Sequence, residues 1–140
     1  MDIREGDSIP RRHCPPVTRM AIARCSVAIA DPNLVHIDEA AARDAGLDNV
    51  IASGALLAGI MGDTVTGWAG IGSIVSCSST LSAPLYPGTA VTVSGRVVEA
   101  GPVVASVELE ATDQDGRRLA RGHYVVKVPC GPSEPGTGAS

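Results

Sequence analysis

The stretch 53–68 constrains what this chain can fold into more than any other part of the sequence. Its large apolar side chains recur every three or four residues, the spacing of a helix that packs against a surface. Nearly all its other residues are small, so we expect a deeply buried helix with Ser53 as its N-cap. Four glycines weaken the helix in isolation but let it approach another backbone closely: Gly54, Gly59, Gly62 and Gly67. Such a helix needs a sheet to cover it.

Strand patterns follow this helix, and two shorter helices precede it. We expect helices at 18–30, capped by Thr18, and from Asp38 to about Gly46. Alternating apolar residues and turn signals predict four strands, at 71–81, 90–99, 103–112 and 119–128. We therefore predict an α+β fold in which helices cover one face of a four-stranded antiparallel meander.

The length of 140 residues suits one domain, which we place at residues 1–129. The remainder, 130–140, is rich in Gly, Pro and Ser, so we expect a disordered tail. The four cysteines have no metal-ligand spacing and should be free thiols: Cys14, Cys25, Cys77 and Cys130. No metal or cofactor is expected.

The charge pattern argues against some classes of partner. The net charge is −4, and the chain has one Trp, two Tyr and no Phe, which disfavours nucleic-acid binding. No segment resembles a signal peptide, and no apolar run is long enough to cross a bilayer. We expect a soluble cytoplasmic protein.

Asp31 and His36 are the first candidates for chemistry. Pro32 disfavours helical backbone at Asp31, and Asn33 suits a turn, so the two side chains lie five residues apart across a non-helical segment. A carboxylate and an imidazole that face one reacting centre can transfer protons near neutral pH. An Asp that caps a helix and a His packed in the core would show the same spacing, so both interpretations stay open.

Gly54 is the second candidate, because it opens the long helix. A helix N-terminus exposes unpaired N–H groups at the positive end of its dipole. Without a Cβ, glycine would let a substrate oxygen reach such an N–H group. A glycine chosen only for packing is the alternative interpretation.

Taken together, these segments resemble the MaoC-like dehydratase family. The resemblance covers ADPNLVH at 30–36, IASGAL at 51–56, WAG at 68–70 and APLYPG at 83–88. The family includes (R)-specific enoyl-CoA hydratases and 3-hydroxyacyl-carrier-protein dehydratases. The resemblance implies a hotdog fold, in which a curved antiparallel sheet wraps a long central helix. It also implies a homodimer, or a heterodimer with another hotdog subunit.

The hydratase motif of this family reads G-D-x-N-P-aliphatic-H. By this resemblance, Asp31 and His36 form the acid/base pair that activates water, and the Gly54 N–H polarises the thioester carbonyl. Asn33, which shapes the turn, and Ser53 are the expected substrate-binding residues. The implied reaction is reversible hydration of 2-enoyl thioesters of coenzyme A or a carrier protein. The motif glycine is replaced by Ala30, and Ser53 stands where His is common.

Two other functions remain open at this point. A hotdog acyl-thioesterase would use an acidic residue on the central helix, for which Asp63 is the candidate. Val35-His36 and the segment 64–68 are similar to subunits of heteromeric enoyl-CoA hydratases that act on steroid side chains. In that case the chain would need a partner subunit.

Overall fold

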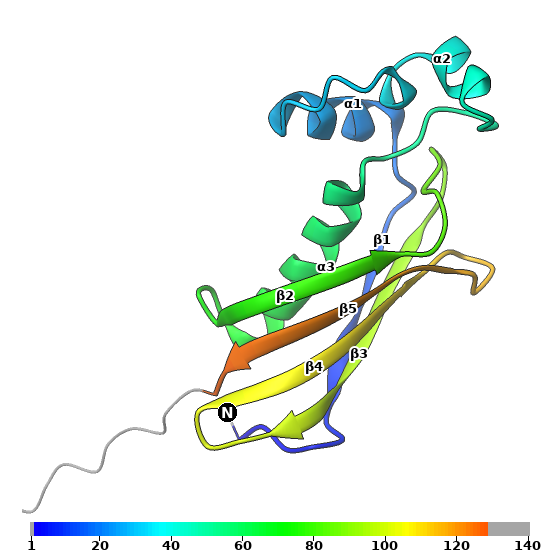
Figure 1. Cartoon of the computed structure of the whole chain (residues 1–140). Helices are drawn as coiled ribbons and strands as arrows, with labels where there is room; N and C mark the ends of the chain where they lie inside the picture. Colours follow the sequence, from blue (N-terminus) through cyan, green and yellow to red (C-terminus); the bar gives the residue numbers. More distant parts are fainter. Residues whose placement is uncertain (1, 129–140) are drawn as a thin grey trace, which may run out of the picture.

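The computed structural model describes residues 2–128, so the tail predicted at 130–140 lies outside the described residues. One antiparallel sheet has the strand order β1-β3-β4-β5-β2 (Figure 1). Its strands are β1 (Ser8–Cys14), β2 (Ile74–Leu81), β3 (Val91–Ala100), β4 (Val104–Thr112) and β5 (Arg118–Lys127). The long helix α3 (Gly54–Ala69) lies against one face of this curved sheet, which confirms the predicted hotdog fold.

Three short helical elements form an overhang above the first turn of α3 (Figure 1). They are α1 (Arg19–Ala28), the 3-10 helix η1 (Leu34–His36) and α2 (Glu39–Asp44). The predicted caps of α1 and α2 are confirmed. Thr18 Oγ1 accepts from the N–H of Ala21 at 3.1 Å, and Asp38 Oδ1 accepts from the N–H of Ala40 at 2.8 Å.

The predicted four-stranded meander is wrong in two respects. The sequence prediction missed β1, which pairs antiparallel with β3 at one edge of the sheet. Pro10, Arg11 and Arg12 interrupt the alternation of apolar and polar residues in this strand. The register of its pairing with β3 also shifts between Ile9 and Arg12. A sheet edge tolerates both features. The second error concerns β2, which pairs with β5 rather than β3, so only β3, β4 and β5 form a meander.

The buried face of α3 packs on the inward-facing valines of the sheet. Met61 and Val65 are fully buried, and Leu57 is nearly so. Gly122 on β5 makes room for this contact, because a Cβ there would lie 2.7 Å from Met61 Cε. Close packing of this kind supplies most of the apolar burial that stabilises such a sheet–helix pair.

The expectation that α3 is deeply buried holds for only one of its sides. Its buried residues are Leu57, Met61, Thr64 and Val65, because the sheet covers a single face of the helix. The predicted close approach at the glycines is also too broad. A Cβ at three of them would meet nothing within 4 Å: Gly59, Gly62 and Gly67. Of the four glycines of α3, only Gly54 has a close neighbour, and that neighbour is the Leu81 side chain rather than a backbone.

The end of α1 determines where Asp31 lies. The N–H of Asp31 donates to the Ser26 carbonyl at 2.9 Å, and the N–H of Ala30 donates to the Val27 carbonyl at 3.1 Å. These two bonds form a Schellman motif, whose left-handed position is usually a glycine. Here Ala30 occupies it, with φ of 54°. This is the position at which the resembled motif has its glycine.

We expect Ala30→Gly to stabilise the protein. The left-handed conformation costs an L-residue about 1–2 kcal/mol, which glycine avoids. The greater freedom of glycine in the unfolded chain lowers stability by about 0.5–1 kcal/mol and offsets part of this gain. The free energy of unfolding should therefore rise by about 0.5–1 kcal/mol, as measured by urea denaturation. As a control, Ala23→Gly in the middle of α1 should lower it by about 1 kcal/mol. A loss of stability in both variants would contradict the strain at Ala30.

Candidate active site

A cavity of about 390 Å³ lies where the overhang, the first turn of α3 and the end of β2 meet. Its walls combine a carboxylate, an imidazole and a helix N-terminus with aliphatic side chains. The lining residues are Asp31, His36, Ile51, Ala52, Ser53, Gly54, Leu57, Leu81, Ser82, Ala83, Pro84 and Leu85. The structure therefore brings Asp31, His36, Ser53 and Gly54 together around one space.

A larger hollow of about 600 Å³ lies on the outer face of the sheet. Its lining includes hydroxyls and charges of both signs, among them Arg96, Glu108 and His123. None of the predicted site residues lines it. A solvated outer face is the usual state of an antiparallel sheet whose other face is covered, so the smaller cavity is the better candidate.

His36 is held in one orientation at the candidate site. Its side chain is only 7% exposed, and Nδ1–H donates to the Ile51 carbonyl oxygen at 2.7 Å. A carbonyl oxygen can only accept, so Nδ1 must carry a proton. Nε2 then faces Asp31 Oδ2 at 3.1 Å. The two atoms are therefore placed to share a proton.

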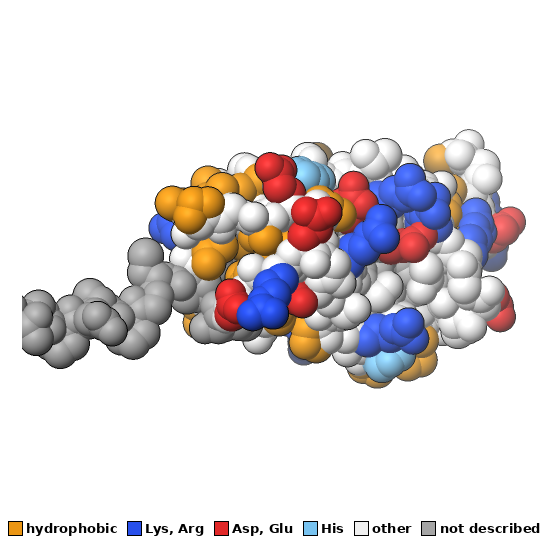
Figure 2. All heavy atoms as spheres, turned by 90° about the horizontal axis from the view of Figure 1, so that it is seen from below, with side chains coloured by type: hydrophobic (Ala, Val, Ile, Leu, Met, Phe, Trp, Pro, Cys, Tyr) orange, Lys and Arg blue, Asp and Glu red, His pale blue; other side chains and the backbone are white. Residues whose placement is uncertain are grey.

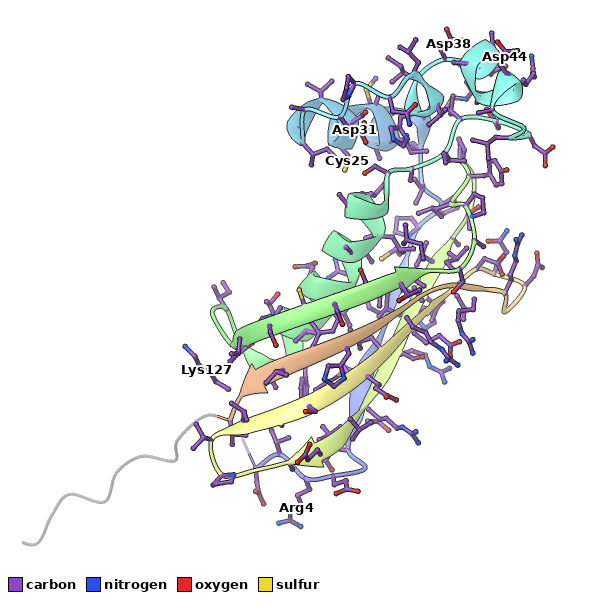
Figure 3. The ribbon with its side chains drawn as sticks, in the orientation of Figure 1. Arg4, Cys25, Asp31, Asp38, Asp44 and Lys127 are labelled. Atoms are coloured by element: carbon purple, nitrogen blue, oxygen red, sulfur yellow. The ribbon has the colours of Figure 1, made fainter. Side chains whose placement is uncertain are left out.

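Asp31 is the only carboxylate among the residues that line the cavity. Its Oδ1 accepts from the N–H of Asn33 at 3.0 Å. Its own carbonyl accepts from the buried hydroxyl of Ser26 at 3.1 Å. Figure 3 shows Asp31 between α1 and the first turn of α3, whereas Asp38 and Asp44 lie around α2. Asp31 is thus the acidic group available to His36 in this cavity.

Asn33 does not line the cavity. Its Oδ1 accepts from the N–H of Val35 at 3.2 Å, which makes it the N-cap of η1, the element that carries His36. The geometry therefore gives Asn33 a positioning role, and its predicted contact with substrate stays a prediction.

Ser53 and Gly54 open α3 at the cavity. Ser53 holds the predicted N-cap position, although its side chain makes no capping hydrogen bond. Its Oγ instead turns toward α1 and lies 3.8 Å from Cys25 Sγ. Within the described chain, the Gly54 N–H has no hydrogen-bond acceptor. That N–H can therefore donate to a bound oxygen, aided by the helix dipole.

Asp63, the candidate acid of the thioesterase alternative, lies outside the cavity. It is nine residues along the chain from Gly54 and forms an ion pair with Arg12 of β1. The hydrogen bond to Asp63 raises the pKa of the Arg12 guanidinium, because it favours the charged form. Asp63 thus links α3 to β1, away from the other candidate residues.

Sequence reasoning missed three contributors to the site. Ser26 anchors the backbone of Asp31, the Ile51 carbonyl fixes the proton on His36, and Leu81 covers the start of α3. A polar residue on the buried side of α1 was a weak signal for Ser26. The other two depend on long-range contacts that leave no local pattern.

Metal-binding groups, membrane-spanning helices and the state of the cysteines can be examined in residues 2–128. No group of three or more His, Cys, Asp or Glu residues is placed to hold a metal ion among residues 2–128. No helix in the same range is long and apolar enough to cross a membrane. Cys14, Cys25 and Cys77 are free thiols, as predicted, and Cys130 lies outside the described residues. Figure 2 shows basic and acidic side chains interspersed over one face of the molecule.

We expect Asn33→Ala to lower both stability and activity, because it removes the cap of the element that carries His36. The loss of a cap costs about 1 kcal/mol. Asn33→Ser keeps an acceptor at the cap and should restore most of the stability and kcat. A substrate contact through the amide would instead leave Asn33→Ser as impaired as Asn33→Ala. Urea denaturation and steady-state kinetics on the same preparations separate the two roles.

Solved structures share this fold. The ChsH1-ChsH2 complex from Mycobacterium tuberculosis matches with a TM-score of 0.83 and 22% identity, over 90% of this chain and 98% of that one. The (R)-hydratase from A. caviae involved in PHA biosynthesis has a TM-score of 0.82 and 22% identity, over 92% and 99%. The HadBC complex from Mycobacterium tuberculosis, a 3R-hydroxyacyl-ACP dehydratase, has a TM-score of 0.70 and 17% identity, over 90% and 98%.

Sequence comparison adds the family. No curated protein sequence matches the chain. The family model of the MaoC-like domain, however, matches residues 5–116, which include the overhang, α3 and the strands up to β4. The resemblance inferred from the motifs is therefore confirmed, and this chain belongs to the MaoC-like domain family.

Proposed function

We propose that this protein reversibly hydrates 2-enoyl thioesters to 3-hydroxyacyl thioesters, carried on coenzyme A or a carrier protein. The contact of 3.1 Å between His36 Nε2 and Asp31 Oδ2, in the cavity that Gly54 also lines, carries this proposal. Addition of water to a conjugated double bond needs a proton-transfer pair and a group that stabilises charge on the carbonyl oxygen. The cavity offers both.

The proposed steps conserve protons. The Gly54 N–H donates to the thioester carbonyl oxygen, on which enolate-like charge develops as water adds to C3. One member of the Asp31/His36 pair accepts a proton from that water. The pair delivers a proton to C2, so it ends the cycle with the number of protons with which it began. The Ile51 carbonyl holds Nδ1–H throughout, which keeps Nε2 directed at Asp31 and the reacting atoms.

The thioesterase alternative has less support in the geometry. Its acid would be Asp63, which is paired with Arg12 and does not line the cavity with Gly54. Hydrolysis would therefore have to use a second site on α3. The residues that line the cavity instead provide a pair suited to moving protons at neighbouring carbon atoms.

Removal of either proton-transfer group should abolish most activity. Asp31→Asn and His36→Gln should each lower kcat/KM by about 10²–10⁴-fold, the usual contribution of a positioned acid or base. The measurement is the loss of the conjugated thioester's ultraviolet absorbance with crotonyl-CoA and longer 2-enoyl-CoA substrates. Asp63→Asn, a matched change on α3 outside the cavity, should keep the wild-type rate.

Two outcomes would contradict this proposal. Undiminished hydration in Asp31→Asn or His36→Gln would remove the pair from the mechanism. Release of free thiol from saturated acyl-CoA, lost in Asp63→Asn, would favour the thioesterase. Circular dichroism of each variant controls for loss of the fold.

We also propose that the protein pairs with a second hotdog subunit. Within residues 2–128, β2 pairs only with β5 and leaves its other edge open, and the outer face of α3 is uncovered. Two of the similar structures are complexes, ChsH1-ChsH2 and HadBC. A partner is either a second copy of this chain or another hotdog subunit, as in heteromeric enoyl-CoA hydratases that act on steroid side chains.

Light scattering coupled to size-exclusion chromatography measures the predicted assembly. We expect the purified chain to have the mass of a dimer, because an open strand edge beside an uncovered helix face favours pairing. A monomer that gains mass and activity only with a co-expressed hotdog subunit would show the heteromeric form. A monomer that is fully active alone would contradict the need for a partner.

A further inference from the structure

We propose that Leu81, the last residue of β2, limits the length of the acyl group that this protein accepts. The inference rests on the proposed hydration of enoyl thioesters and adds the residue that selects among them. It comes from the contact between Leu81 and the start of α3, in the wall of the cavity that holds Asp31 and His36.

Leu81 lies directly against the first residue of α3. A Cβ on Gly54 would be only 2.6 Å from Leu81 Cδ1, so the leucine side chain occupies the space above the Gly54 Cα. The same side chain is 52% exposed. A large apolar group that lines a cavity and is half exposed stands at the mouth, between the cavity and solvent.

Different residues of the cavity lining would contact different parts of a bound substrate. With the thioester oxygen at the Gly54 N–H and C3 beside Asp31 and His36, the polar groups of the cavity are already used. The alkyl chain beyond C3 must therefore follow the aliphatic lining. Leu57 and Leu85 belong to the core and are 2% and 3% exposed, so Leu81 is the least confined large aliphatic group on this path.

The backbone at Leu81 has little freedom to retreat from a longer chain. Leu81 pairs with Ala120 of β5, and the next N–H, of Ser82, donates to the Leu119 carbonyl at 2.8 Å. Rotation of the leucine side chain therefore changes the room beside Gly54 without breaking these hydrogen bonds. Since apolar pockets discriminate by about 10–200-fold per methylene group, this one side chain is enough to set a length preference.

Leu81→Ala tests the inference with 2-enoyl-CoA substrates from crotonyl-CoA to 2-decenoyl-CoA. The ratio of kcat/KM for decenoyl-CoA to that for crotonyl-CoA should rise by about tenfold or more. Leu81→Phe should shift the ratio in the opposite direction. Val75→Ala is the matched control, because Val75 is on the same strand, 54% exposed and outside the cavity. It should leave the ratio unchanged.

The outcomes distinguish this inference from the proposed function. An unchanged ratio in both Leu81 variants, with wild-type hydration intact, would overturn the role of Leu81 and leave the function standing. An equal change at every chain length would also overturn it, because Leu81 would then contact the thiol-carrier arm. If the wild-type protein hydrates no 2-enoyl-CoA of any length, the proposed function fails and this inference fails with it.

Discussion

The hydrogen bond from His36 Nδ1 to the Ile51 carbonyl is the contact on which the candidate site depends. The overhang and α3 are separate pieces of secondary structure, and no strand of the sheet comes within 8 Å, Cα to Cα, of α1, η1 or α2. This bond of 2.7 Å, with the bond of 3.1 Å from the Ile51 N–H to the Val35 carbonyl, ties η1 to the segment that leads into α3. The same contact brings the imidazole to the helix N-terminus and fixes which ring nitrogen faces Asp31.

Backbone hydrogen bonds also place the other member of the pair. Asp31 follows a helix end whose left-handed residue is Ala30, so the turn keeps its geometry at the cost of some strain. Ser26 secures both the N–H and the carbonyl of Asp31. Both ring nitrogens of His36 and both carboxylate oxygens of Asp31 already have a partner. A water molecule would therefore bind through the remaining lone pairs of the Asp31 oxygens. A site of this kind is preorganised without a large polar network.

The sequence predicted the parts of this protein that local rules control. The caps at Thr18 and Asp38, the long helix and the alternating strands of the meander follow from short-range patterns. β1 was missed because Pro10 and neighbouring charges disguise an edge strand, and the pairing of β2 with β5 depends on the whole sheet. For the site, spacing alone allowed either a catalytic His36 or a core one. Family motifs favoured catalysis, and the structure shows a buried ring whose Nε2 faces a carboxylate.

The position of Leu81 connects the acyl group to the assembly of the protein. It ends β2, the strand whose outer edge is open among the described residues, and it also covers the first turn of α3. A subunit that adds a strand to this edge would lie beside the mouth of the cavity. It would restrict rotation of the Leu81 side chain. Under the proposed role of Leu81, a change of partner would then change which thioesters are accepted.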